Sequence, residues 1–364
     1  MQSIDLAHSS PTAQELADQV RQAFLYAQPL RIIGGGSKAF YGRPVEGKPL
    51  PVNQLQGIIN YEPSELVITA KAGTPLHIIE TTLAEQGQML GFEPPYFSPT
   101  ATLGGTIACG LSGPRRPYSG AVRDFVLGVT MINGKGEILR FGGQVMKNVA
   151  GYDVSRLMCG AQGTLGVLLD ISLKVVPKPA FEQTQQLSCN QQQMQTLLSQ
   201  LGRQPLPISA TLLHNDRLSI RLSGTEPGVR AAALKIGGES LPATAPLWQQ
   251  LKEQQHAFFD SADNYIRLSL PPAAPAVPEH LVTDQLIEWG GAQRWIRPHD
   301  NSDNADLIKW TTSHGGHVTT IDRTVQKSTQ FHPLSRPLLQ LSQRIKASFD
   351  PARILNPGRL YPDL

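Results

Sequence analysis

The chain has 364 residues, of which 40% are hydrophobic and 17% are charged, with a formal net charge of +3. This composition is typical of a globular protein with an ample core, and the length predicts two domains or one large domain. The small net charge, without a basic stripe among aromatic residues, argues against a nucleic-acid partner. The cysteines Cys109, Cys159 and Cys189 form no C-x-x-C pair. They are too few for an iron–sulfur cluster, which needs about four thiolates.

The sequence also predicts a location. The longest apolar runs fall well short of the roughly 20 residues that span a bilayer. Residues 1–10 lack the basic and apolar regions of a secretory signal. We therefore expect a cytoplasmic protein without direct membrane insertion, which would reach the inner face of the membrane only through partners. The sparse, odd number of cysteines agrees with a reducing compartment.

The N-terminal region predicts a helix, a strand and a glycine-rich loop. Residues 12–28 are amphipathic, and Thr12 and Glu15 have the spacing of a capping box. A short strand at 30–33 leads directly into Gly34-Gly35-Gly36-Ser37-Lys38. This order aims backbone N–H groups at phosphate oxygens, although an ordinary glycine-rich turn has the same composition. The loop matches neither the Walker A sequence nor a G-x-G-x-x-G that leads into a helix.

The region that follows, up to residue 180, reads mainly as β structure. The predicted elements are a strand at 66–70, a helix capped by Thr74 from Pro75 to near Gly87, a hairpin at 125–141 with Asn133-Gly134 as its turn, and a strand at 167–176. Pro177-Lys178-Pro179 then marks the predicted domain boundary.

The second half of the chain predicts an α+β layer with an antiparallel sheet. Its predicted elements are a helix within the glutamine-rich residues 182–203, strands at 208–213 and 218–222 around the turn 214–217, a helix at 227–236, strands at 265–270 and 294–296, and a terminal helix at 338–349.

The most informative stretch is 98–124, SPTATLGGTIACGLSGPRRPYSGAVRD. It is crowded with Gly, Ala, Ser and Thr and has few bulky apolar side chains, so it cannot form a self-sufficient core element. Glycine lets the backbone approach another surface closely. We therefore expect a flat, polar ligand to lie against this stretch.

Four segments together resemble the FAD-binding domain of the vanillyl-alcohol oxidase and p-cresol methylhydroxylase (PCMH) superfamily. They are IIGGGSK, the stretch 98–124, KNVAGYDVSRLMCGAQGTLGV and the tail DPARILNPGR. Within this superfamily, the chain is similar to the family of FAD-binding E subunits of bacterial glycolate oxidase, also called glycolate dehydrogenase. The resemblance implies an α+β fold: a PCMH-type FAD-binding domain of two subdomains at 1–180, a smaller α+β cap domain with an antiparallel sheet at 181–330, and a helix and tail at 331–364 that return to the flavin.

The resemblance also implies roles for individual residues. The loop Gly34, Gly35, Gly36, Ser37 and Lys38 would cradle the FAD pyrophosphate through backbone amides. Pro99, Thr100, Gly104, Gly105 and Thr106 would line the flavin with its ribityl and phosphate groups. Gly163 and Val167 would meet the adenine half or the ring edge, and Asn356 would bring the C-terminal segment to the isoalloxazine. Small residues and exposed N–H donors suit an extended, phosphate-bearing cofactor.

Several polar residues of the flavin region keep two interpretations. Arg115, Arg116 and Arg123 could neutralise phosphate or a substrate carboxylate, with Arg115 as the candidate for substrate binding, or they could be surface or structural arginines. Cys109 could attach the flavin covalently, but small buried cysteines are common. Lys38 and Ala39 follow Ser37 where families with a histidyl flavin link carry His, which favours non-covalent FAD. The pair Tyr152-Asp153 reads as a structural hydrogen-bonding corner.

The chain departs from the superfamily's catalytic members near its C-terminus. Those 2-hydroxy-acid dehydrogenases carry a histidine-rich signature that supplies a base and often metal ligands, and this sequence lacks it. The nearest segment is 310–317, WTTSHGGH. His317 is the candidate catalytic base or substrate contact. No metal site is expected, because no carboxylate accompanies His314 and His317. A strand end that packs on the flavin domain is the alternative.

These observations leave three hypotheses for function. The first is the FAD-binding subunit of a complex that oxidises glycolate, and in some cases D-lactate, together with a second flavoprotein subunit and an iron–sulfur subunit. The second is a free-standing FAD-dependent dehydrogenase for another small 2-hydroxy acid. The third is a flavin-binding structural or electron-relay subunit without a substrate site. The related UDP-N-acetylmuramate dehydrogenases match less well, because their active-site segments are absent.

Overall fold

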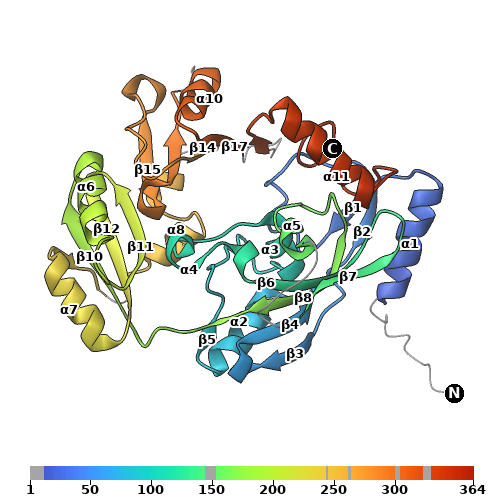
Figure 1. Cartoon of the computed structure of the whole chain (residues 1–364), viewed down its shortest axis with the longest axis horizontal. Coiled ribbons are helices and arrows are strands. Elements are labelled where there is room, and N and C mark those ends of the chain that lie inside the picture. Colours follow the sequence, from blue (N-terminus) through green and yellow to red (C-terminus); the bar gives the residue numbers. More distant parts are fainter. Residues whose placement is uncertain (1–11, 144–152, 243–244, 261–263, 300–303, 323–328) are drawn as a thin grey trace.

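Two antiparallel sheets organise the protein. A computed structural model describes residues 12–143, 153–242, 245–260, 264–299, 304–322 and 329–364. Its two large sheets have five and nine strands (Figure 1). The five-stranded sheet is built from the first half of the chain, and the nine-stranded sheet begins with the strand that follows Pro177–Ala180.

The N-terminal helix α1 (Ala13–Leu25) confirms the predicted capping box, because the Thr12 side chain accepts from the Glu15 N–H at 3.2 Å. The helix ends before residue 28, and Ala27 has a left-handed φ of 49°. Strand β1 (Leu30–Ile33) follows as predicted and pairs in parallel with β2 (Lys48–Pro51). The glycine-rich loop therefore leaves the end of a short, two-stranded sheet.

The five-stranded sheet carries the core of the first half. Its strands are, in spatial order, β3 (Ile58–Glu62), β4 (Val67–Lys71), β8 (Val167–Lys174), β6 (Val126–Ile132) and β7 (Ile138–Gly142). Strands β6 and β7 form the predicted hairpin, and the Asn133 side chain accepts from Lys135 N and Glu137 N within its turn. Helices α2 (Leu76–Glu85) and α3 (Leu103–Cys109) pack their buried leucines and isoleucines into the same core cluster as strands β4, β6 and β8.

One predicted helix cap is wrong. The N-cap of α2 is Pro75, and it makes no side-chain cap hydrogen bond. The Thr74 hydroxyl instead bonds with both backbone groups of Gly57, accepting from its N–H at 3.0 Å and donating to its carbonyl at 3.2 Å. The predicted cap residue therefore holds a neighbouring loop.

The nine-stranded sheet confirms the antiparallel layer that the second half predicts. Its order is β13-β10-β12-β11-β15-β16-β14-β17-β18. The strands are β10 (Phe181–Ser188), β11 (Ile208–His214), β12 (Arg217–Gly224), β13 (Glu239–Ser240), β14 (Asn264–Ser269), β15 (Asp284–Glu288), β16 (Gln293–Arg297), β17 (His317–Asp322) and β18 (Thr329–Phe331). Helices α6 (Gln191–Leu201) and α7 (Glu226–Ile236) share a core cluster with the apolar residues of β12.

The prediction for the glutamine-rich region is right in its second half and incomplete in its first. Residues 191–201 form α6, but 181–188 form strand β10, which pairs with β12 along its whole length. Strand β15 was not predicted, and β17 was anticipated only by the strand end that was the alternative interpretation of residues 310–317. The remaining short elements are α4 (Arg116–Ser119), α5 (Val154–Leu157), α8 (Leu247–Lys252), α9 (Ala257–Asp260), α10 (Asn304–Ser313), β5 (Gln88–Met89) and β9 (Val176–Pro177).

The C-terminal helix α11 (Arg336–Phe349) leads into a tail whose Leu355 lies beside β1 and whose Ile354 and Leu355 share a core cluster with α1 (Figure 1). Lys346 is 2% exposed, and its Nζ donates to the carbonyls of Thr164 and Leu355 at 2.7 and 2.8 Å and to Asp350 Oδ2 at 2.8 Å. Asp350 is fully buried and accepts the N–H groups of Ile354 and Leu355. This buried pair turns the chain so that Leu355 bridges Leu30 of β1.

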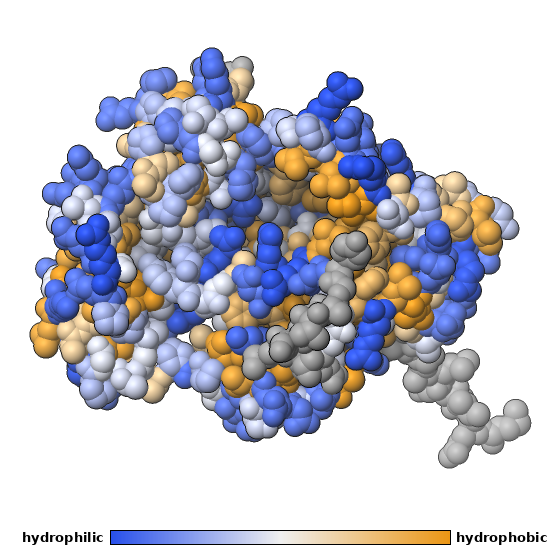
Figure 2. Space-filling view, viewed as in Figure 1, coloured by the Kyte–Doolittle hydropathy of each residue, from blue (hydrophilic) through white to orange (hydrophobic). Residues whose placement is uncertain are grey.

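The outer face of α11 is partly apolar. Leu338 and Leu341 are 53% and 45% exposed. Figure 2 shows hydrophobic side chains over this part of the surface, with hydrophilic ones around them. In the described part of the chain, none of the helices is both long and apolar enough to cross a membrane.

Replacement of Lys346 by Met should lower the free energy of unfolding by about 3–5 kcal/mol, because it leaves the Asp350 carboxylate buried without its cation. Chemical denaturation measures the change. Arg344→Met, at an exposed position of the same helix, is the matched control and should change the stability by less than about 0.5 kcal/mol. Equal effects of the two substitutions would contradict a structural role for the buried pair.

Candidate functional site

A cavity of about 570 Å³ opens between the glycine-rich loop, α3, the segment after α5 and the C-terminal tail. Its size is that of sites for drug-sized ligands and cofactors. The candidate residues that line it are Gly34, Gly35, Gly36, Ser37, Lys38, Gly104, Gly105, Gly163 and Asn356. Four segments that lie far apart in the sequence therefore meet at one cavity.

The glycine-rich loop lies against the backbone of residues 98–102. A Cβ atom on Gly35 would overlap the Thr100 carbonyl, and the Thr100 hydroxyl donates to the Gly35 carbonyl at 2.6 Å. A Cβ on Gly34 would lie 3.0 Å from Thr102 Oγ1. Gly36 differs from both, because its φ is +72° and no atom lies within 4 Å of an added Cβ. The loop therefore needs glycine for close approach at 35 and for a left-handed conformation at 36.

Helix α3 forms a second wall of the cavity. Thr102 is its N-cap, and the Thr102 side chain accepts from Gly105 N at 3.2 Å. Gly104 donates its N–H to the Ala72 carbonyl at 2.7 Å, and an added Cβ would lie 2.8 Å from the Ala72 Cβ. The small residues of this wall thus let the helix start directly against Ala72, the residue after strand β4, and leave its inner side open to the cavity.

Asn356 joins three parts of the wall. Its Oδ1 accepts from Ile32 N at 2.8 Å, and its Nδ2 donates to the Gln162 carbonyl at 2.7 Å. An added Cβ on Gly163 would lie 2.7 Å from that same Nδ2. Both polar atoms of the Asn356 side chain therefore bond within the protein, and these bonds hold the tail beside β1.

Arg359 is a cavity residue that the sequence analysis missed. It lines the cavity, and its guanidinium donates to Gln162 Oε1 at 2.9 Å and to the carbonyls of Arg43 and Tyr41 at 2.7 and 2.9 Å. These bonds brace the loop after Lys38. The motif N-P-G-R in the tail was the available signal, but its last residue received no role.

The charge of the lining suits an anion. Lys38, Arg31 and Arg359 line the cavity, and no Asp or Glu occurs among the described residues of its wall. Lys38 is 6% exposed, and burial lowers the pKa of its ammonium, which the nearby Cys109 and Glu253 oppose. Burial raises the pKa of the Cys109 thiol. These basic residues line the same cavity as the glycine-rich loop.

Four of the expected FAD contacts lie outside the lining of this cavity. Pro99 and Thr100 are exposed, with Thr100 behind the loop. Thr106 is fully buried in α3, and its hydroxyl has no hydrogen-bond partner among the described residues. Val167 starts β8 and belongs to the core cluster around α1. Their roles toward FAD stay predictions.

The residues present fit the FAD that the resemblance implies. A pyrophosphate suits this lining, because the backbone of Gly34–Gly36 is part of it, its charged side chains are basic, and the described wall has no carboxylate. The apolar side chains of Ile32, Val52 and Leu168 in the same lining suit flat rings. This combination of a glycine-rich loop, a basic lining and apolar walls is what an extended dinucleotide requires.

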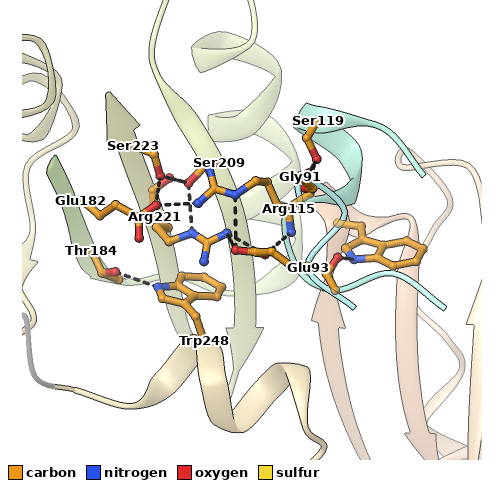
Figure 3. A network of polar contacts seen from close by, with 12 residues as sticks. Gly91, Glu93, Arg115, Ser119, Glu182, Thr184, Ser209, Arg221, Ser223 and Trp248 are labelled. Carbon is orange, nitrogen blue, oxygen red and sulfur yellow. Dashed lines mark hydrogen bonds and ion pairs between the residues drawn. The ribbon is translucent and has the colours of Figure 1, made fainter. Parts of the chain in front are cut away.

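Arg115 belongs to a different structure, a buried ionic network between the two sheets (Figure 3). Its Nε lies 3.3 Å from Glu93 Oε1 and its Nη2 lies 2.5 Å from Glu182 Oε1. Arg221 on β12 binds Glu93 at 2.9 Å and Ser209 at 3.0 Å. Burial raises the pKa of Glu93, but the charges and hydrogen bonds of Arg221 and Arg115 outweigh it and lower the pKa below its ordinary value. Substrate binding by Arg115 stays a prediction, and the geometry favours a structural role.

The other candidates lie at separate places outside the cavity lining. Arg116 lies 4.4 Å above the Trp289 ring, and Arg123 is exposed in the short helical turn Val122–Asp124. His314 begins the turn after α10, where its Nδ1 contacts the Trp310 carbonyl at 2.8 Å. Tyr152 lies outside the described residues, and Asp153 caps α5 by accepting from Arg156 N.

His317 begins strand β17, so the segment 310–317 joins the end of a helix to a strand. Although His317 keeps an exposed edge, partial burial lowers the pKa of its imidazole, and the charges of Arg267, His332 and Arg116 lower it further. No cluster of three or more His, Cys, Asp or Glu that could hold a metal ion occurs in the described ranges. His317 is not part of the cavity lining, and its catalytic role stays a prediction.

Gly35→Ala should abolish FAD binding, because the new Cβ cannot be accommodated without moving the Thr100 backbone. Gly36→Ala is the matched control: its Cβ meets open space, so FAD should be retained, at a cost in stability of about 1–2 kcal/mol for the left-handed backbone. The flavin absorbance of the purified proteins measures FAD content. Full FAD occupancy of Gly35→Ala would contradict the geometry of the loop.

Arg115→Met should lower the free energy of unfolding by about 3 kcal/mol at neutral pH, because Glu93 and Glu182 lose a buried cation. The depressed pKa of Glu93 stabilises the fold above its unfolded pKa, and this stabilisation is lost as pH falls through the folded pKa. The difference between wild type and variant should therefore shrink in acid. Denaturation at several pH values tests this, and a variant of unchanged stability that fails only to bind substrate would support the original prediction.

Three comparisons place the chain among known proteins. Residues 10–142 match the family "FAD binding domain". The chain is 47% identical to glycolate oxidase subunit GlcE of Escherichia coli (strain K12), over 97% of this chain and 98% of that protein. It is 33% identical to glycolate oxidase subunit GlcD of Bacillus subtilis (strain 168), over 39% of this chain and 30% of that protein.

The fold is shared with a solved structure. An alkyldihydroxyacetonephosphate synthase has a TM-score of 0.65 at 16% identity, over 95% of this chain and 76% of that chain. The expected α+β fold with a PCMH-type FAD-binding domain is confirmed. FAD is the cofactor of this domain. Since nearly the whole of both chains is aligned at 47% identity, the protein belongs to the family of glycolate oxidase subunit GlcE.

Proposed function

We propose that this protein is the FAD-binding subunit of a glycolate oxidase complex, in which glycolate, and in some cases D-lactate, is oxidised to the 2-oxo acid. The observation that carries the proposal is the basic, glycine-walled cavity in a chain that aligns with GlcE over almost its full length. The chemistry that bound FAD would supply is acceptance of the hydride from the carbon that bears the hydroxyl. The protein's own part is to bind and orient the cofactor and to exclude water.

The binding roles follow from the cavity. The amides of Gly34–Gly36 and the charges of Lys38 and Arg359 would hold the pyrophosphate, while α3 and the segment around Gly163 would line the rest of the cofactor. FAD would be held non-covalently. The raised pKa of the Cys109 thiol keeps it protonated, and a protonated thiol is a poor nucleophile for flavin attachment.

The same proposal covers partners, location and domains. The sequence has only three cysteines, so a second flavoprotein subunit and an iron–sulfur subunit would carry the remaining redox steps. The complex would lie in the cytoplasm or at the inner face of the membrane.

The FAD-binding domain would comprise residues 1–180, the cap domain 181–330 and the returning tail 331–364. The change of sheet after Pro177 supports the first boundary.

Two alternatives make different predictions. A free-standing 2-hydroxy-acid dehydrogenase would turn over its substrate as an isolated chain with an artificial electron acceptor. A structural or electron-relay subunit would bind FAD and assemble, but substitution of His317 would leave the activity of the complex unchanged. The absence of the histidine-rich signature supports a chain that depends on its partners.

An anaerobic titration separates these possibilities. The FAD-loaded chain, alone and assembled with its co-expressed partners, is mixed with glycolate and with D-lactate while the flavin absorbance is followed. We expect bleaching in the assembled complex and none in the isolated chain. Bleaching of the isolated chain would establish the free-standing enzyme, and a complex whose flavins stay oxidised with both acids would overturn the proposal.

A further inference from the structure

A carboxylate of the second half holds the backbone beside the FAD cavity. Glu253 follows α8 and is 9% exposed. Its Oε2 accepts the N–H groups of Tyr96 and Phe97 at 3.0 and 2.8 Å, and its Oε1 accepts that of Tyr96 at 3.2 Å. Phe97 has a left-handed φ of 56°, which is unfavourable for a residue with a side chain. Glu253 therefore stabilises a strained turn.

The turn that Glu253 holds contacts two residues of the FAD cavity. Lys38 Nζ donates to the Tyr96 carbonyl at 3.4 Å and lies over the Phe97 ring, 5.8 Å from its centroid. The Phe97 ring also packs edge-on against that of Phe40, with centroids 5.3 Å apart. Lys38 and Phe40 line the cavity, whereas Glu253 lies outside its lining. Glu253 is therefore linked to the cavity through residues 96 and 97.

One peptide group connects the two charges. The C=O of Tyr96 and the N–H of Phe97 belong to the same planar, trans amide, so they point in opposite directions. Glu253 accepts from the N–H end of this amide, and Lys38 donates to its C=O end. Each hydrogen bond polarises the amide and so strengthens the bond at the other end. The carboxylate and the ammonium thus support each other through the amide.

Glu253 is itself held by the nine-stranded sheet. Leu251, near the end of α8, shares an apolar cluster with Tyr265 of β14. The Tyr265 hydroxyl donates to Gln254 Oε1 at 2.6 Å. Residues on both sides of Glu253 are therefore fixed to the sheet, and the position of its carboxylate follows that of the second half.

The charges around Lys38 favour the same link. Burial lowers the pKa of the Lys38 ammonium, and Cys109 and Glu253 oppose this shift. Lys252 lowers the pKa further, and Arg359, whose Nη2 donates to the Lys38 carbonyl at 3.4 Å, adds another positive charge. Burial also raises the pKa of the Cys109 thiol, so at neutral pH this thiol carries no charge. Glu253 is therefore the group that supports the charge of Lys38 at neutral pH.

We propose that Glu253 is a positioning residue for FAD, which holds Lys38 charged and in place for the pyrophosphate through the amide between residues 96 and 97. The inference rests on the proposed role of Lys38 toward the pyrophosphate. An ammonium that is fixed before its ligand arrives loses less freedom on binding than a mobile one. Glu253 would thus contribute to FAD affinity from the second half of the chain without lining the cavity.

The test is a fluorescence titration of the FAD-depleted full chain with FAD. Glu253→Gln should weaken FAD binding about 10-fold, because a neutral side chain no longer supports the charge of Lys38. Glu253→Ala, which also removes the hydrogen-bond acceptors, should weaken it roughly 10- to 100-fold. Asp284→Asn is the matched control. It neutralises another carboxylate of the second half, which lies 3.6 Å from Arg297 Nη1, and should leave FAD affinity unchanged.

The pH dependence of FAD affinity separates positioning from a general loss of structure. In the wild type, affinity should fall as the pH rises through the pKa of Lys38, because the pyrophosphate then loses its cation. Without the charge of Glu253 this pKa is lower, so in Glu253→Gln the fall should begin at a lower pH. Lys38→Met should remove this step, and Asp284→Asn should leave it where it is. A purely structural Glu253 would weaken binding equally at every pH.

Unchanged FAD affinity in Glu253→Gln would overturn the inference, and so would a loss of affinity that is equal at every pH. Because Glu253→Gln preserves the shape of the side chain, it decides the matter even where Glu253→Ala does not fold. If Lys38→Met binds FAD as tightly as the wild type, the proposed role of Lys38 fails and the inference fails with it. If Lys38→Met weakens binding and Glu253→Gln does not, the role of Lys38 stands and only the inference is lost. The titration contains no glycolate, so its result is independent of whether the complex oxidises this acid.

Discussion

The architecture of the FAD cavity depends on one buried ion pair, Lys346 with Asp350. Lys346 satisfies all three of its N–H donors with protein oxygens, and Asp350 satisfies its carboxylate with Lys346 and two backbone N–H groups. A buried pair that is completely hydrogen-bonded is tolerated, whereas either partner alone is costly. The turn that it fixes is what places Asn356 and Arg359 in the wall, so a cavity built mainly by the first half of the chain is completed by its last ten residues.

Buried charges also lie at the contact between the two sheets, and they too have hydrogen-bond and ion-pair partners. Strand β12 alternates Leu218, Ile220 and Leu222, buried against α6 and α7, with Ser219, Arg221 and Ser223 on the opposite face. A polar face can be buried only if its groups find partners. Glu93 and Arg115 from the other half supply them, so a specific set of ion pairs joins the two halves at this place. An apolar cluster that brings Tyr41 together with Tyr265 and Trp295 joins them elsewhere.

Local patterns predicted the local structure well. The capping box at Thr12, the hairpin turn at Asn133 and the glycine-rich loop after β1 were all predicted, because each depends on residues a few positions apart. The errors share one cause. Strand β10 is rich in glutamine, a residue with no strand preference, and it exists because β12 pairs with it. Thr74 binds a loop that local spacing cannot reveal, and Arg359 acts on residues more than 300 positions away. In each of these three cases the structure depends on a partner that is distant in the chain.

Arg115 and Arg116 are two residues whose different roles could not be predicted from the sequence. They are adjacent, equally charged, and both enter the same short helix, so the sequence offers no reason to separate them. Arg115 is 8% exposed and meets two carboxylates, while Arg116 lies over the Trp289 ring and meets no carboxylate within 4 Å in the described ranges. An arginine whose charge is already neutralised stabilises the fold and has little left for a ligand. The ion-pair partners of each guanidinium, rather than its place in the motif, therefore separate the two arginines.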